Sequence, residues 1–176
     1  MDATQAFPFP NASFDYVFSE HMIEHVSYDA GVRMLIESFR VLRPGGKVRI
    51  STPPLEFLID TWMAERNGTL TAAQQQCIDY NMRRKGNGVM EHPNACFLLN
   101  YFMRMDYPDP RGHIFLYDDR TLRVAMTTAG FVNIEPFRIK ESRDSHLQGL
   151  EKDERLPAGM LQLNTFTLEG TKPVSA

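Results

Sequence analysis

Residues 14–51 read FDYVFSEHMIEHVSYDAGVRMLIESFRVLRPGGKVRIS, and this stretch decides the fold. Its first part, Phe14 to Ser19, is a continuous run of aromatic and β-branched side chains, which is typical of a strand buried on both faces. A helix follows, with Ser27 or Asp29 as its N-cap. Its apolar positions recur at i, i+3, i+4 and i+7, the spacing of one helix face: Val32, Leu35, Ile36 and Phe39.

A turn and a second strand complete this unit. Pro44 cannot continue the helix, and the two glycines after it allow backbone angles that other residues avoid. Lys47 to Ser51 then alternates as a new strand. The strands of a β-α-β unit are parallel, and in such sheets ligands bind beyond the carboxyl ends of the strands. The polar residues at those two ends, 19–25 and 51–54, are therefore the candidates for a functional site.

The motifs of this unit resemble a known family. FDYVFSEHMIEHV at 14–26, followed by ESFRVLRPGGKVRISTP at 37–53, is similar to class I S-adenosylmethionine-dependent methyltransferases of the type 11 group. In that family an EH-rich segment follows the fourth strand and an L(K/R)PGG turn precedes the fifth. Residues 2–15 resemble the segment between the third and fourth strands, and residues 116–137 resemble the last helix and sixth strand. The resemblance implies an α/β fold with a Rossmann-like methyltransferase sheet.

One part of the family pattern does not occur in this chain. The family holds its cofactor mainly with a glycine-rich loop after the first strand and an acidic residue that ends the second, but the 11 glycines include no GxGxxG or GxGxG run. Met1 stands where the third strand would end. We therefore expect a single truncated domain, 1–176, whose incomplete sheet contains strands four to seven. The resemblance implies the order four, five, seven, six, with the last strand, residues 161–172, antiparallel between its neighbours.

The residues between the fifth strand and the last helix form an insertion. It runs from Leu55 to His113, longer than a simple connection, and such insertions at the ligand face are often lids. Its apolar positions predict three short helices: Leu58, Ile59, Trp62 and Met63, then Cys77, Ile78 and Met82, then Phe97, Leu98, Tyr101 and Phe102. We interpret the insertion, 55–113, as a helical cap that selects the substrate.

The resemblance implies S-adenosylmethionine as the cofactor and assigns residues to it. Asp2 and Ala3 match the positions that receive the adenine ring, and the loop after the fourth strand lies beside the methionine part of the cofactor and the substrate: Ser19, Glu20 and His21. Methyl transfer from a sulfonium depends largely on alignment, and a base is needed only where the acceptor loses a proton. Three residues can serve as that base, and no sequence feature selects among them: Glu20, His21 and His113.

The resemblance predicts methyl transfer to a small-molecule or glycan-type acceptor, with a cofactor site that is incomplete in this chain. The alternative is a catalytically inactive accessory or dimerisation protein with a methyltransferase fold. A third possibility comes from HMIEH at 21–25, which is formally the HxxEH motif of inverted zinc peptidases. That motif must lie inside a helix, whereas here it directly follows a strand. We therefore expect no metal.

Composition excludes several partners. The formal charge is 19 minus 22, or −3, and the scattered basic residues indicate no nucleic-acid surface. No apolar run approaches the ~20 residues that span a bilayer, so we expect no membrane contact and a cytoplasmic location. The fourth strand would be an uncovered apolar edge in the incomplete sheet, with Tyr16, Val17 and Phe18 exposed. We therefore expect a homodimer, or a partner chain, that pairs through this strand.

Overall fold

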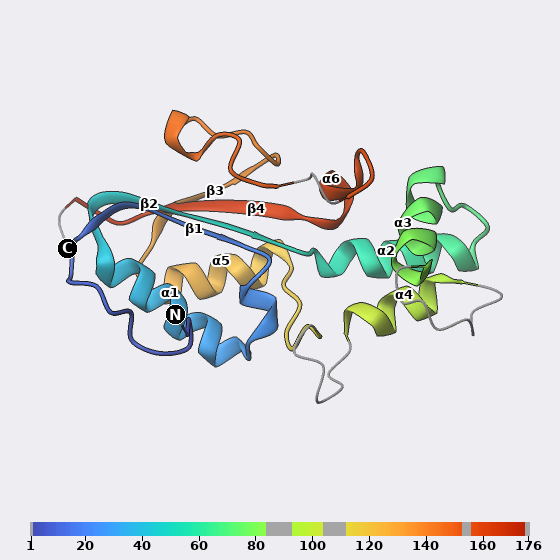
Figure 1. Cartoon of the computed structure of the whole chain (residues 1–176), viewed down its shortest axis with the longest axis horizontal. Helices are drawn as coiled ribbons and strands as arrows, with labels where there is room; N and C mark the ends of the chain where they lie inside the picture. The colour runs from blue at the N-terminus through green and yellow to red at the C-terminus, as the bar shows by residue number, and fades with distance from the viewer. Residues whose placement is uncertain (1, 84–92, 104–111, 153–155, 175–176) are drawn as a thin grey trace.

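The computed structural model, drawn in Figure 1, describes residues 2–83, 93–103, 112–152 and 156–174. These residues build one four-stranded sheet in the order β1-β2-β4-β3. Its strands are β1 (Phe14–Glu20), β2 (Leu42–Thr52), β3 (Val132–Phe137) and β4 (Phe166–Thr171). β1 and β2 are parallel, whereas β4 is antiparallel to both β2 and β3. The predicted order of strands four, five, seven and six is therefore confirmed.

Helix α1 (Tyr28–Val41) connects the two parallel strands. It begins at Ser27, whose hydroxyl accepts a hydrogen bond from the amide of Ala30, as one of the two predicted caps. Leu35 is fully buried as expected, but Ile36 is 45% exposed. The prediction for Ile36 is wrong because the face that meets the sheet is centred elsewhere on the helix, on Ala30, Met34, Leu35, Ser38 and Val41.

Two helices cover one face of the sheet. In Figure 1, α1 and α5 (Asp119–Thr128) lie together on the same side of the strands. Asp118 caps α5 by accepting a hydrogen bond from the amide of Thr121. The apolar residues of this layer form the main core with β2 and β4, and its fully buried members include Leu35, Leu42, Val48, Ile50, Leu122, Met126 and Leu168.

The other face is covered by a polar segment, residues 138–152, which contains the short helix η2 (Ser145–Leu147). Beneath it lies Arg49 of β2, whose side chain is fully buried. Its guanidinium donates to Glu151 at 2.6 Å and to Glu169 of β4 at 2.5 Å. Ser51 donates to the same Glu151 oxygen at 2.8 Å. This Arg49 network of buried charges and hydroxyls takes the place of an apolar core on this face.

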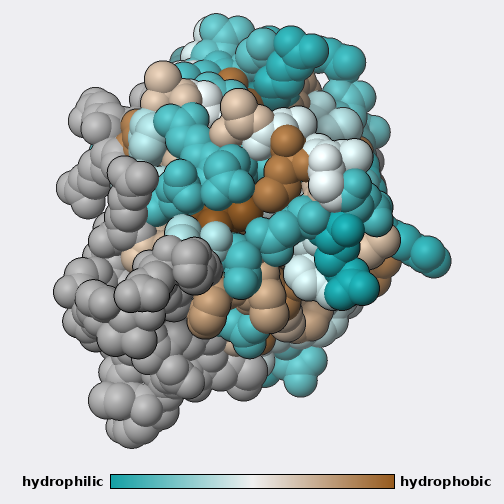
Figure 2. All heavy atoms as spheres, turned by 90° about the vertical axis from the view of Figure 1, so that its right-hand side faces the viewer, coloured by the Kyte–Doolittle hydropathy of each residue, from teal (hydrophilic) through white to brown (hydrophobic). Residues whose placement is uncertain are grey.

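The described residues of the predicted cap form three helices, as expected: α2 (Leu55–Arg66), α3 (Ala72–Arg83) and α4 (Ala95–Phe102). They pack around a second core that includes Leu58, Ile78, Leu98 and Phe102. In Figure 1 they lie beyond the carboxyl ends of β1 and β2. Figure 2 views this end and shows apolar side chains exposed between hydrophilic ones. The large apolar side chains that the cap exposes are Ile59, Met63, Phe97 and Met103.

Two further expectations change. The segment predicted to open the closing strand instead forms helix α6 (Met160–Asn164), and β4 begins only at Phe166. β1 is not buried on both faces, because it is the edge of the sheet and its apolar residues Tyr16, Val17 and Phe18 are half-buried. Within the described ranges, no helix combines the length and the apolar content that a membrane crossing requires.

The Arg49 network predicts a large loss of stability when one of its carboxylates is removed. Glu151→Gln leaves a buried guanidinium with less compensating charge, so unfolding by urea should show a loss of about 3 kcal/mol. The matched control is Arg43→Ala, which breaks an exposed ion pair with Asp15 at 2.8 Å and should cost less than about 1 kcal/mol. Equal losses in the two variants would mean that the Arg49 network is unimportant.

A pH dependence is expected from Asp144 in the polar segment. The hydrogen bond from Lys47 at 2.9 Å, helped by bonds from the backbone and ring of His146, holds the pKa of this carboxyl well below its usual range. A lowered folded-state pKa stabilises the protein above the unfolded pKa of about 4, and this contribution disappears as the pH falls. Asp144→Asn should therefore lose about 1 kcal/mol at pH 7 and progressively less as the pH falls below about 4, measured by urea unfolding. A difference that is constant with pH would contradict this.

Candidate active site

The carboxyl ends of β1 and β2 meet at the edge of the sheet that faces the cap. Glu20 pairs with Ser51 as the last residue pair of the two strands. The amide of His21 then donates to the carbonyl of Ser51 at 2.9 Å, and the chain turns into the single 3₁₀ turn η1 (Ile23–His25). The sheet therefore positions His21 and η1 at the place where α/β proteins bind their ligands.

His21 has a backbone conformation that is unusual for a residue with a side chain. Its φ of 47° is left-handed, and this turn directs the ring away from the line of β1. The ring lies between two partners: Nδ1 is 3.2 Å from Oε1 of Glu24, and Nε2 is 2.9 Å from the hydroxyl of Thr165. With Nδ1 protonated, the ring donates to the carboxylate and Nε2 accepts from the hydroxyl. Strained backbone of this kind is concentrated at functional sites.

Glu24 is the centre of the site and is fully buried. Its Oε2 accepts a hydrogen bond from the hydroxyl of Thr52 at 2.7 Å, and its Oε1 faces His21. Burial opposes ionisation, but the hydrogen bonds from His21 and Thr52 together lower the pKa of Glu24. The site therefore contains a buried carboxylate, held in place by residues that follow β1 and β2.

A distant segment joins the site through backbone hydrogen bonds. The amide of Ile114 donates to the carbonyl of Glu24 at 2.7 Å, and the amide of Leu55 donates to the carbonyl of Tyr117 at 3.0 Å. Residues 112–117 are thus held between η1 and the start of α2. This docking places the carbonyl of Gly112 at 3.1 Å from Nδ1 of His25, 87 positions earlier in the chain.

His113 lies beside His25, with the ring centroids 4.8 Å apart. Its Nδ1 is buried and has no hydrogen-bond partner. Burial lowers the pKa of His113, so the ring is neutral at pH 7. Glu24, His25 and His113 each offer one oxygen or nitrogen atom that could bind a metal ion, and these atoms lie within 4.8 Å of one another.

The structure brings together two of the three candidate bases. His21 and His113 both belong to the cluster around Glu24. Glu20 does not, because its carboxylate accepts a hydrogen bond from the amide of Lys152 at 3.0 Å. Ser19, at the end of the same strand, is half-buried.

The two residues expected near the adenine ring lie in the N-terminal loop. Asp2 is exposed and forms a local turn in which one of its carboxylate oxygens accepts hydrogen bonds from the amide and hydroxyl of Thr4. Ala3 packs against the main core. Among the described residues, no hydrogen bond joins Asp2 to the cluster around Glu24. Its second carboxylate oxygen remains available to a ligand.

Sequence reasoning placed Glu24, His25 and Thr52 within the candidate ranges 19–25 and 51–54 but assigned them no role in the site. Glu24 and His25 stand in the EH-rich motif, so a signal for them existed, but Thr52 and Thr165 are joined to it only by folding. The HxxEH interpretation fails on geometry. Residues 23–25 form one 3₁₀ turn and His21 precedes it with a left-handed φ, so the two histidines do not share a helical face.

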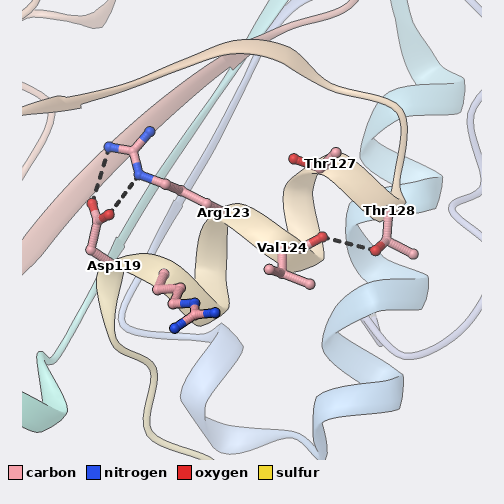
Figure 3. A pocket seen from close by; sticks show the side chains of 6 residues that line it. Asp119, Arg123, Val124, Thr127 and Thr128 are labelled. Atoms are coloured by element: carbon pink, nitrogen blue, oxygen red, sulfur yellow. Dashed lines mark hydrogen bonds and ion pairs between the residues drawn. The ribbon is translucent and has the colours of Figure 1, made fainter.

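One depression on the described surface lies away from this cluster. Figure 3 shows this depression, of about 410 Å³, on the outer face of α5. Asp119 and Arg123 form an ion pair along the helix there, and the hydroxyl of Thr128 donates to a backbone carbonyl of the same helix. Because these polar groups satisfy one another and the buried face of α5 is turned away, this depression is an ordinary helix surface.

Comparison with known proteins agrees with this geometry. The sequence model of a family described as a methyltransferase domain matches residues 1–135. No curated protein sequence matches the chain. Several solved structures share its fold at low identity, which supports the fold alone.

Three of these structures illustrate the similarity. A possible exported protein from Bordetella parapertussis has a TM-score of 0.52 and 15% identity over 98% of this chain and 43% of its own length. A putative O-methyltransferase from Nostoc punctiforme has a TM-score of 0.51 and 14% identity over 98% of this chain and 34% of its own length. An S-adenosylmethionine-dependent methyltransferase from Archaeoglobus fulgidus has a TM-score of 0.50 and 12% identity over 98% of this chain and 66% of its own length. The chain thus spans between about a third and two thirds of these proteins, and its family match identifies it as a member of the methyltransferase domain family.

Proposed function

We propose that the chain takes part in S-adenosylmethionine-dependent methyl transfer to a small-molecule or glycan-type acceptor. The observation that carries this proposal is the hydrogen-bonded pair of His21 and Glu24 at the carboxyl end of β1. This is the edge where the fold binds ligands, and the cap of α2 to α4 lies directly beyond it. The family match supports the same chemistry.

The residues present fit one side of the cofactor. Ser19, Glu20 and His21 would hold its methionine end, and the free carboxylate oxygen of Asp2 and the backbone of Ala3 would receive the adenine ring. S-adenosylmethionine supplies a methyl group on a sulfonium, whose leaving group is already activated. Because the sequence contains no glycine-rich loop, we propose that the opposite wall comes from residues outside these 176.

Of the three candidate bases, His21 has the geometry that proton removal requires. Its Nδ1 faces a buried carboxylate that fixes the tautomer and the ring orientation, and its Nε2 already faces a hydroxyl, that of Thr165. An acceptor hydroxyl in place of Thr165 would deliver its proton to Nε2. Glu20 and His113 remain possible proton acceptors, but neither has an equivalent orienting partner among the described residues.

A second candidate function is supported by the absence of the glycine-rich loop from the sequence. A methyltransferase fold without that loop could be an inactive accessory or dimerisation protein. The position of β1 at the edge of the described sheet also supports this second function, because an edge strand offers backbone groups to another chain. Cofactor binding by the isolated chain distinguishes the two functions.

Calorimetric titration of the 176-residue chain with S-adenosylhomocysteine is the decisive measurement. We expect micromolar binding, with the opposite wall of the site supplied by a second copy of the chain paired at β1. Ser19→Trp should weaken this binding at least tenfold, about 1.4 kcal/mol, by placing a large side chain near the carboxyl end of β1. The control is Asp119→Ala on the outer face of α5, which should leave binding unchanged. If the wild-type chain gives no heat of binding at millimolar ligand, the result supports the accessory function instead of methyl transfer.

We also propose that β1 pairs with another chain, either a second copy or a partner that supplies the missing half of the sheet. Its outer edge has no neighbouring strand among the described residues. Tyr16, Val17 and Phe18 are only half-buried there. Full burial of such a side chain is worth about 1.5 to 3 kcal/mol, so pairing at this edge would be favourable.

Light scattering during size exclusion tests this edge. We expect the wild-type chain to be dimeric at micromolar concentration, and Val17→Lys to give a monomer or an unfolded chain because a charge would enter the paired strand. Ile36→Lys, on the exposed side of α1, should leave the dimer intact. A folded wild-type monomer at every concentration would argue against pairing between copies.

A further inference from the structure

We infer that Glu24, His25 and His113 form a binding site for a divalent transition-metal ion, with zinc as the ion to test first. One ligand atom from each residue lies within 4.8 Å of the others. Two imidazoles and one carboxylate are the ligand set of many catalytic zinc sites, which keep a further position open for water or substrate. Two imidazoles disfavour magnesium and calcium, which prefer oxygen ligands alone.

The hydrogen bonds of the two histidines leave the correct nitrogen atoms available. His25 directs Nδ1 to the carbonyl of Gly112 at 3.1 Å, so that nitrogen carries the proton and Nε2 keeps its lone pair. Nε2 faces Glu24, at 3.9 Å from Oε1. His113 is hydrogen-bonded to the backbone of Phe102, and its Nδ1 is the buried atom without a partner. Two lone pairs and a carboxylate oxygen therefore face one another.

This arrangement is unfavourable unless something positive lies between the three groups. A buried nitrogen without a hydrogen bond costs free energy, and the same lone pair next to a carboxylate is repelled by it. A metal ion relieves the conflict for all three groups at once.

Outer contacts around the three groups have the form that metal sites use. Ligating histidines usually donate their second nitrogen to a carbonyl or carboxylate, and ligating carboxylates are themselves hydrogen-bonded. His25 does so through Gly112, and Glu24 through Thr52 at 2.7 Å and His21 at 3.2 Å. Bond lengths of about 2.0 to 2.2 Å require the two rings to close on the ion by roughly 1 Å.

This site differs from the HxxEH motif in its ligands. His21, which that motif would use, is an orienting neighbour of Glu24 here, and the third ligand is His113 from the segment after the cap. It also reverses the expectation of no metal, which considered residues 21–25 alone. The motif covers residues 21–25 alone, so it could not include His113, which belongs to the segment 112–117.

The test is zinc binding by the full chain after treatment with a chelator, measured by competition with a chromogenic chelator and without cofactor or acceptor. We expect one equivalent of zinc to bind with submicromolar affinity and to raise the melting temperature. His25→Ala and His113→Ala should each weaken binding by at least about 100-fold, since removing a ligand should cost no less than the 10 to 100-fold of an outer contact. His146→Ala is the control, because this exposed histidine lies beside Asp144 and Tyr16 and is not a member of the cluster of Glu24, His25 and His113.

Cobalt provides a measurement that needs no variant. Its visible spectrum in the wild-type chain should show the intense bands of a four- or five-coordinate site with nitrogen and oxygen ligands. Binding weaker than about 10 µM, or binding that His25→Ala and His113→Ala leave unchanged in folded protein, would overturn the site. Because no cofactor is present, these outcomes are independent of whether the chain transfers methyl groups.

Discussion

The buried carboxylate of Glu24 is the interaction on which the site depends. The carboxylate receives hydrogen bonds from His21 after β1 and from Thr52 at the end of β2. The backbone carbonyl of Glu24 receives a hydrogen bond from the amide of Ile114. Through His21 it is also linked to Thr165, just before β4. The single residue Glu24 thus connects four separate parts of the chain, and leaving its buried carboxylate unpaired would be costly.

The two faces of the sheet are stabilised by different physics. The face under α1 and α5 is an apolar core, in which burial itself provides the driving force. The face under residues 138–152 contains the Arg49 network, which contributes directional contacts and depends on every carboxylate being in place. A polar segment without regular helices can cover that face because its backbone and side chains satisfy the charges beneath it.

Much of the fold was predictable from local sequence patterns. Contacts between residues distant in sequence were not predictable in this way. The strand, helix and second strand of residues 14–51 follow from side-chain periodicity, and the resemblance implied the correct strand order. Ile36 shows the limit of periodicity, since several rotations of one helix satisfy the same pattern. The site was only partly predictable. His21 and His113 were named, but the position of His113 beside Glu24 depends on backbone hydrogen bonds to residues 112–117 that no local pattern encodes.

Those backbone bonds fix the base of the insertion to the sheet edge. Residues 112–117 are held by Glu24 and Leu55, so the position of His113 does not depend on α3. His113 also packs against Phe102 of α4, with the ring centroids 5.2 Å apart. Mutations in α3 can therefore accumulate during evolution without moving the reactive groups, whereas changes in α4 would reach them.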